Sequence, residues 1–294
     1  MRDLADQSFG GEWTEEKLKR VRSYLESYQQ ALKNQPFTTW YVDAFAGTGS
    51  RSAPESMEGG FLSLLAGEDA DEEDAGRYRD GSAKIALSLP RPFDRYLFIE
   101  KSKSKCEELA STIGREFPNL QDRCTILPED SNTSLCRWCE ERDWSRERAV
   151  VFLDPFGLQV KWSTISSLGA TKGVDLWYLF PLSVLRLMTH DGVIVPSWRA
   201  SLDSVFGTSE WESRFYERSQ SPLFVEIEMI ERVATPENVQ VFIEERLRTC
   251  FAEVANGSVL KNSRKSPLYL LCFAVANKRG APIAMRIARH ILGG

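Results

Sequence analysis

Apolar runs and amphipathic stretches alternate along the first two thirds of the chain. From Glu15 to Leu32, apolar residues recur every three or four positions, which predicts a helix with one buried face and with Thr14, Glu16 and Lys17 as its polar start. Later runs with the β-branched and aromatic content of buried strands lie at residues 39–45, 95–100, 124–130, 149–157 and 174–180. Helical patterns separate them, at residues 80–90, 103–117, 132–142 and 161–170. Ser82 is the expected cap of the first of these helices.

This alternation predicts an α/β fold. Parallel neighbouring strands need crossover connections, so a doubly wound, mostly parallel sheet covered by helices on both faces is the simplest arrangement. After position 182 the pattern becomes helical at residues 183–192, 198–219 and 235–254, with Pro236 at a helix start. Two strands around a turn at residues 258–277 and a helix at 282–292 close the chain. We therefore expect a helical cap inserted between strands 5 and 6.

The domain organisation follows from the same pattern. We expect an N-terminal helical segment (1–39), a core (40–182), a helical cap (183–257) and a closing strand pair with a C-terminal helix of the core (258–294). Within the core, residues 51–79 are rich in Gly, Ser, Asp and Glu, including "GEDADEEDAG", and carry too little apolar surface to fold alone. This stretch is interpreted as a flexible acidic insertion at the surface.

Composition restricts the environment of the protein. The chain has 294 residues and a net charge of −5, and none of its apolar runs approaches the about 18 to 20 residues that a bilayer span needs. Its N-terminus lacks the apolar centre of a signal peptide, so a cytoplasmic protein without membrane contact is expected. The six cysteines then stay reduced. Cys136 and Cys139 form a "CRWC" pair without a second pair, which favours two packed thiols on a helix over a zinc site.

The acidic net charge does not exclude nucleic acid, because a local basic rim can hold phosphates. Candidates for such a rim are Lys101, Lys103 and Lys105, the run from Lys261 to Lys265, and Lys278 with Arg279. A solvated lysine face is the alternative for each group.

Polar residues follow the predicted strands at their carboxyl ends, where ligands bind in doubly wound sheets. Gly47 and Gly49, after the strand that ends near Asp43, allow a ligand to approach the backbone, although a plain tight turn explains them as well. A dinucleotide fingerprint needs glycine where Ser52 stands, and no GK[ST] follows. Neither a nicotinamide cofactor nor a nucleoside triphosphate is favoured, which argues against an oxidoreductase.

Two acids follow the next two strands. Glu100 can accept hydrogen bonds from both hydroxyls of a ribose, and the acidic insertion accounts for its long separation from the glycines. Alternatively, Glu100 is a solvent-facing residue at the end of a strand and has no role in binding. Asp130, beside Ser131 and Asn132, can bind a purine amine or cap the following helix, and the two roles are compatible.

The stretch "FLDPFG" is the most informative. A strand delivers Asp154, Pro155 fixes the backbone, and Phe156 offers a flat ring, so an acceptor lies next to a stacking surface. A planar exocyclic amine could be held there, and catalysis would then rest on positioning rather than on proton transfer. A simple turn after a buried strand is the alternative.

In this order, "DAFAGTGS", "FIEKS", "EDSN" and "FLDPFG" resemble the ligand-binding motifs of class I S-adenosylmethionine-dependent methyltransferases. More narrowly, "WTEEK", "YVDAFAGTGS", "DGSAKIAL" and "FLDPFG" resemble the three-Cys-motif partner proteins, a bacterial family whose name records association with a separate three-cysteine protein. The resemblance runs roughly from Trp13 to Leu292.

The resemblance implies a seven-stranded sheet with S-adenosylmethionine as cofactor over the turn from Gly47 to Gly49. By carry-over, Asp43 and Gly47 face the methionine moiety, Glu100 the ribose and Asp130 the adenine amine. Phe45 and Gly49 complete the implied cofactor site, and the implied acceptor site comprises Asp154, Pro155 and Phe156. Amino-methyltransferases of nucleic acids usually carry Asp/Asn-Pro-Pro-aromatic, whereas here Phe156 follows a single proline.

The leading functional hypothesis is therefore a methyltransferase that acts on an amine of a nucleic-acid base or nucleotide. The alternative is a catalytically inactive, methyltransferase-like protein that works by binding a three-cysteine-motif protein. Its contact surface would lie among the helices between positions 183 and 254, where Trp198, Trp211 and Phe215 stand among charged residues. Alternatively, these aromatic side chains form the hydrophobic core of the cap.

Overall fold

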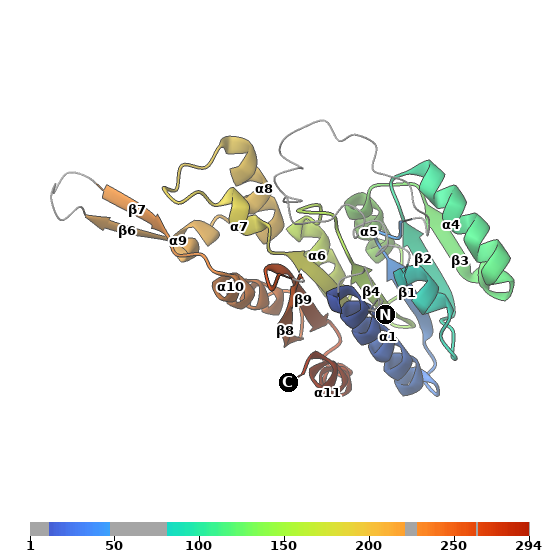
Figure 1. Ribbon diagram of the computed structural model, residues 1–294. Coiled ribbons are helices and arrows are strands. Elements are labelled where there is room, and N and C mark those ends of the chain that lie inside the picture. The colour runs from blue at the N-terminus through green and yellow to red at the C-terminus, as the bar shows by residue number, and fades with distance from the viewer. Residues whose placement is uncertain (1–11, 48–80, 221–227, 263, 294) are drawn as a thin grey trace, which may run out of the picture.

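The computed structural model describes residues 12–47, 81–220, 228–262 and 264–293 (Figure 1). Gly49, Ser52 and the predicted insertion at 51–79 lie outside these residues. The fold is α/β, with a seven-stranded sheet in the order β3-β2-β1-β4-β5-β9-β8. Its strands are β1 (Thr38–Asp43), β2 (Arg95–Ile99), β3 (Cys124–Leu127), β4 (Glu147–Leu153), β5 (Val174–Pro181), β8 (Glu253–Lys261) and β9 (Pro267–Val275).

The first five strands are parallel, and only β9 runs antiparallel to its neighbours β5 and β8. The predicted doubly wound, mostly parallel sheet is confirmed. Side chains alternate across it with the period of two that a strand imposes. In β4, Val150 and Phe152 belong to the core on one face, and Val151 and Leu153 to the core on the other. Burial on both faces explains why these strands are apolar throughout.

Two layers of helices cover the sheet. One face carries α1 (Glu12–Leu32), the helical residues 81–87, α4 (Lys103–Glu116) and α11 (Ala281–Leu292). The other carries α5 (Ser131–Glu140), α6 (Trp162–Ala170) and α10 (Pro236–Arg248). The 3₁₀ helix η1 (Pro118–Arg123) connects α4 to β3. As predicted, Pro236 begins a helix, and Thr235 caps it by accepting a hydrogen bond from the Asn238 N–H.

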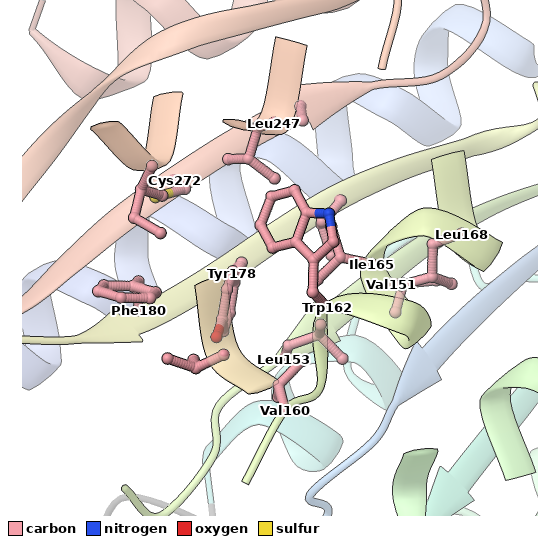
Figure 2. Close-up of a cluster of buried hydrophobic side chains, with 14 of the residues drawn as sticks. Val151, Leu153, Val160, Trp162, Ile165, Leu168, Tyr178, Phe180, Leu247 and Cys272 are labelled. Atoms are coloured by element: carbon pink, nitrogen blue, oxygen red, sulfur yellow. The ribbon is translucent and has the colours of Figure 1, made fainter. Parts of the chain in front are cut away.

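The core under α6 centres on Trp162. Figure 2 shows its indole among side chains from β4, β5, β9, α6 and α10, and 6% of Trp162 is exposed. Gly207 caps the C-terminal end of α8 (Pro196–Phe206) with a φ of 69°, and a Cβ at this position would overlap the indole ring. Glycine is therefore required here both by the left-handed backbone and by the packing.

The insertion between β5 and β8 is helical in large part, with one departure. It holds α7 (Val184–Leu187), α8 (Pro196–Phe206), α9 (Trp211–Phe215) and α10, but also an antiparallel hairpin of β6 (Tyr216–Gln220) and β7 (Glu228–Arg232) (Figure 1). The prediction of one helix through 198–219 is wrong in part, because this stretch is divided into α8 and α9 and its last residues belong to β6. The helix predicted at 183–192 is one short turn. Pairing with the next strand, β7, decides the conformation of β6 against its local pattern.

The aromatic residues of the cap belong to its hydrophobic core. Trp211 and Phe215 are 0% and 1% exposed, and Trp198 is partly buried against the same cluster. The hypothesis that they form a contact surface is therefore wrong, and the interpretation as cap core is confirmed.

Three further observations concern the cysteines, metal ligands and membrane spans. Cys136 and Cys139 lie on α5, as expected, and all six cysteines are free thiols. Among the described residues, no three His, Cys, Asp or Glu side chains gather as a metal site would require. Nor does any helix in those parts of the chain combine the length and the apolar character needed to cross a membrane.

Candidate functional site

The candidate site lies at the carboxyl edge of the sheet, between β1 and β4. The chain passes from β1 to β2 on one side and later returns to β4 on the other, which makes this the switch point of the topology. Asp43 is the last residue of β1, in register with Phe152, and Asp154 directly follows β4. The strand order therefore brings together two carboxylates that the sequence separates widely.

Asp43 is buried and its carboxylate is already engaged. It accepts hydrogen bonds from the Phe45 N–H at 3.2 Å and from the Ser82 hydroxyl. Burial raises the pKa of Asp43 to about 6, the two hydrogen bonds and Lys17 act to lower it, and Asp154 acts to raise it. Asp43 thus joins the turn after β1 to the helical residues 81–87. Ser82, expected as a helix cap, lies inside that helical stretch.

The turn after β1 is held against the end of β2. Gly47 has a φ of 61°, and its N–H donates to Oε2 of Glu100 at 3.2 Å. The Ser102 N–H donates to the other carboxylate oxygen at 3.0 Å. Each oxygen of a carboxylate can accept a second hydrogen bond, so Glu100 retains the capacity to bind a diol. This hydrogen bond brings Gly47 and Glu100, both assigned from the sequence to the cofactor site, next to each other.

Asp154 forms an ion pair that the sequence analysis missed. Its Oδ2 lies 2.6 Å from Nζ of Lys17 in α1, and the ammonium also lies 5.9 Å from the centre of the Phe152 ring. Lys17 is 1% exposed, so its placement as part of a polar helix start is wrong. The signal was present, because Lys17 precedes Val21 by four positions and Tyr24 by seven, on the buried face of the helix.

The residues after Asp154 form a braced turn. Pro155 is buried, Phe156 is half-buried, and Gly157 has a φ of 68°. The Phe156 N–H donates to Oε1 of Gln159 at 3.1 Å. Asn132 holds the next residues, since its amide donates to the Gln159 carbonyl at 2.9 Å and its oxygen accepts from the Lys161 N–H at 2.9 Å. Asn132 therefore supports the "DPFG" turn instead of standing free beside Asp130.

The remaining predicted cofactor residues lie at the same edge. Asp130 is exposed and caps α5, its Oδ1 accepting from the Thr133 N–H at 3.1 Å and from the Thr133 hydroxyl at 3.3 Å. Ser131 donates to the Ala44 carbonyl, which links the end of β3 to the turn after β1. Phe45 is half-buried against the core on the α5 and α6 face. Gly49 lies outside the described residues.

One further polar group at this edge was not anticipated. The buried hydroxyl of Ser183, just beyond the carboxyl end of β5, finds no hydrogen-bond partner among the described residues. A buried hydroxyl without a partner costs free energy, so this group is suited to meet a ligand.

The predicted basic groups separate. Lys101 and Lys103 are exposed at the start of α4, which follows β2, and Lys261 ends β8. Both groups lie at the carboxyl edge of the sheet, but near opposite ends of the row of strands. Lys278 and Arg279 follow the antiparallel β9 and lie at the other edge, away from the candidate site. The three groups do not form one continuous rim.

No protein-family model and no curated protein matches the chain. Solved structures do. A DUF519-family protein from Legionella pneumophila is 14% identical with a TM-score of 0.37, over 79% of this chain and 92% of that one. A Listeria monocytogenes protein, described as a candidate S-adenosylmethionine-dependent methyltransferase, is 9% identical with a TM-score of 0.36, over 85% and 97%. The methyltransferase domain of bacterial CtHen1 is 12% identical with a TM-score of 0.35, over 87% and 98%.

At these identities and TM-scores, the likeness concerns the arrangement of helices and strands alone. It adds no residue-level assignment. Membership of the three-Cys-motif partner family is not among these findings.

Proposed function

We propose that this protein binds S-adenosylmethionine and transfers its methyl group to an amine of a nucleic-acid base or nucleotide. The observation that carries the proposal is the fixed position of the Glu100 carboxylate. The Gly47 and Ser102 N–H groups hold it at the switch point of a sheet ordered β3-β2-β1-β4-β5-β9-β8.

The chemistry of the donors and acceptors fits this cofactor. Glu100 would accept from the two ribose hydroxyls with its remaining lone pairs. Gly47, in the left-handed region, lets the ligand approach the backbone where a side chain would intrude. Asp43 would shape the turn facing the methionine moiety, since its carboxylate already accepts from the Phe45 N–H and Ser82. Asp130 keeps exposed acceptor capacity for the adenine amine while it caps α5.

The acceptor side would use the "DPFG" turn. The bound cofactor would supply an electrophilic methyl group. Asp154, oriented by the Lys17 ammonium, would accept a hydrogen bond from the target amine, and the half-buried Phe156 ring would support a planar base. Pro155 restricts the backbone between them. Rate acceleration would then come chiefly from holding the amine in line with the methyl group.

Calorimetric titration with S-adenosylmethionine and with its demethylated product tests the cofactor half. Gly47→Val places a branched side chain at a φ of 61° and should abolish binding. Gly280→Ala is the matched control, because its Cβ would meet only Asn277, at ordinary contact distances of 3.8 Å and above. The absence of binding by the wild-type protein, or equal binding by Gly47→Val, would refute the cofactor assignment. Transfer of label from methyl-labelled donor to DNA, RNA or nucleotides tests the acceptor half.

A second candidate function is supported by the surface of the cap. Val193 and Val195, in the loop before α8, are 73% and 47% exposed. The same stretch of chain is tied to the separate β6–β7 sheet, since the Arg232 N–H donates to the His190 carbonyl. Apolar side chains gathered at an exposed site are typical of protein contacts. The protein would then be an inactive methyltransferase-like partner of a three-cysteine-motif protein. Co-purification with such a protein, together with no methyl transfer to any nucleic acid, would favour this alternative.

A further inference from the structure

A groove of about 580 Å³ lies between α1 and α11, which pack against each other on one face of the sheet (Figure 1). On α1, Lys19, Ser23 and Ser27 stand four residues apart and line one wall in a single row. Arg20 lies beside this row. Its guanidinium is fixed by a hydrogen bond to the Ser258 hydroxyl of β8 at 2.8 Å and by an ion pair with Glu16 at 2.6 Å. This wall therefore offers two hydroxyls and two cations.

The α11 wall has two rows with the same spacing. Arg286 and His290 form an exposed polar row, and Ile287 and Ile291 form a half-buried apolar row that packs against the core. A ligand lying along the groove would thus meet cations and hydroxyls at its rims and aliphatic surface on one side.

The charges of the groove are unbalanced, although the whole chain carries a net charge of −5. Glu16, the carboxylate among the lining residues, is paired with Arg20. Lys19 and Arg286 are both exposed, and in the described ranges neither forms an ion pair. Two cations that face one space, with no ion pair among the described residues, favour an anionic ligand there.

The groove runs toward the candidate site. α1 begins at the carboxyl edge of the sheet, where Lys17 reaches Asp154, and α11 begins at the opposite edge, because it follows the antiparallel β9. The rows from Ser27 to Lys19 and from Arg286 to His290 therefore both advance to the edge that carries Asp154. Lys19 and Lys17 are two positions apart on α1, one turned to the groove and the other to the site.

We propose that this groove binds the sugar-phosphate backbone of a single-stranded nucleic acid. Lys19 and Arg286 contact phosphates, Ser23 and Ser27 donate to phosphate oxygens, and the two isoleucines cover sugar surface. A strand seated there presents a base to the carboxyl edge, and this consequence alone rests on the proposed function. An acidic peptide is the competing occupant. The two hydroxyls in the same row as Lys19 favour phosphates, because phosphate oxygens accept from hydroxyl donors as well as from lysine and arginine.

The test uses the full chain and a fluorescent single-stranded oligonucleotide of about 12 nucleotides, within the length that such sites cover. The double variant Lys19→Glu with Arg286→Glu should weaken binding at least about tenfold and reduce the salt dependence by about 0.7 for each phosphate that the variant no longer neutralises. Lys278→Glu with Arg279→Glu makes the same change of charge at the opposite edge and should stay within about twofold of wild type.

Equal losses in the two double variants would overturn the proposal, because binding would then follow net charge alone. Displacement of the oligonucleotide by polyglutamate of equal charge would overturn it in favour of an acidic peptide. Calorimetry with S-adenosylmethionine on the same samples separates the two proposals. Cofactor binding without oligonucleotide binding refutes the groove only, and the reverse result refutes the cofactor assignment only. Unchanged thermal unfolding of each variant shows that the fold is intact.

Discussion

The ammonium nitrogen of Lys17 lies 2.6 Å from Oδ2 of Asp154, although 137 positions separate the two residues in the chain. Their side chains are 1% and 14% exposed. The pair joins the N-terminal helix to the carboxyl end of the strand β4, in the middle of the sheet. This contact therefore links the packing of α1 to the charge of the candidate acceptor site.

Lys17→Met retains most of the buried volume and removes the charge. It leaves the Asp154 carboxylate without its cation, so the free energy of unfolding should fall by about 3 kcal/mol, the low end for a broken buried pair because Asp154 keeps some contact with solvent. Urea denaturation of Lys17→Met, Asp154→Asn and the double variant measures their coupling. Lys19→Met, an exposed neighbour, should change stability by less than about 0.5 kcal/mol. Additive effects in the double variant would contradict the pairing.

Glu100→Gln should weaken S-adenosylmethionine binding by about tenfold or more. The substitution removes the charge that strengthens each hydrogen bond to the carboxylate, and one of the Gly47 and Ser102 N–H groups would lose its acceptor. Calorimetric titration measures the change. Glu107→Gln, an exposed position on α4, should bind as wild type does. The same affinity in both variants would remove Glu100 from the cofactor site.

Asp175 should make the stability of the protein depend on pH. It is buried at the start of β5 and accepts a hydrogen bond from the Tyr24 hydroxyl at 2.6 Å. Burial raises the pKa of Asp175 from 3.8 to about 7, against the lowering effects of Tyr24 and Arg148. The folded state therefore holds this proton to a higher pH than the unfolded chain. The contribution of Asp175 to the free energy of unfolding is greatest below about pH 4, falls as the pH rises to about 7, and is constant above it.

Asp175→Asn keeps an acceptor for Tyr24 and removes the titration. Relative to wild type, this variant should gain up to about 4 kcal/mol between about pH 4 and pH 8, since one pKa unit corresponds to about 1.4 kcal/mol. Urea denaturation across this range measures the difference. Asp122→Asn, an exposed substitution on η1, should follow the wild-type curve. A curve for Asp175→Asn parallel to wild type would show that Asp175 is ionised throughout.

Gly207→Ala should destabilise the packing of the cap on the core. The residue has a φ of 69°, and the added Cβ would overlap the indole of Trp162, so strain and overpacking together should cost about 3 kcal/mol. Gly293→Ala, at a φ of 85° with nothing within 4 Å of the new Cβ, should cost about 1 kcal/mol from backbone strain alone. Thermal unfolding of the two variants distinguishes these costs. Equal losses would mean that Trp162 moves aside.

Much of the sheet could be predicted from the sequence, because strand and helix periods are local properties of the chain. The run that became β5 is apolar at nearly every position and proved to be buried along its whole length. The acids placed at strand ends, Asp43, Glu100 and Asp154, do lie at one edge, because parallel strands bring their carboxyl ends together. Asp130 caps α5, one of the two roles that the sequence left open.

Contacts between separate elements were decided only in the tertiary structure. Local pattern placed Tyr216 in a helix, and pairing with Arg232 of β7 made it a strand. Lys17 seemed polar by type, and only its position against Asp154 shows why a lysine is buried there. The groove between α1 and α11 depends on the packing of the two ends of the chain. Periodicity reports which face of an element is buried, whereas the partner that covers this face is fixed by packing across the whole fold.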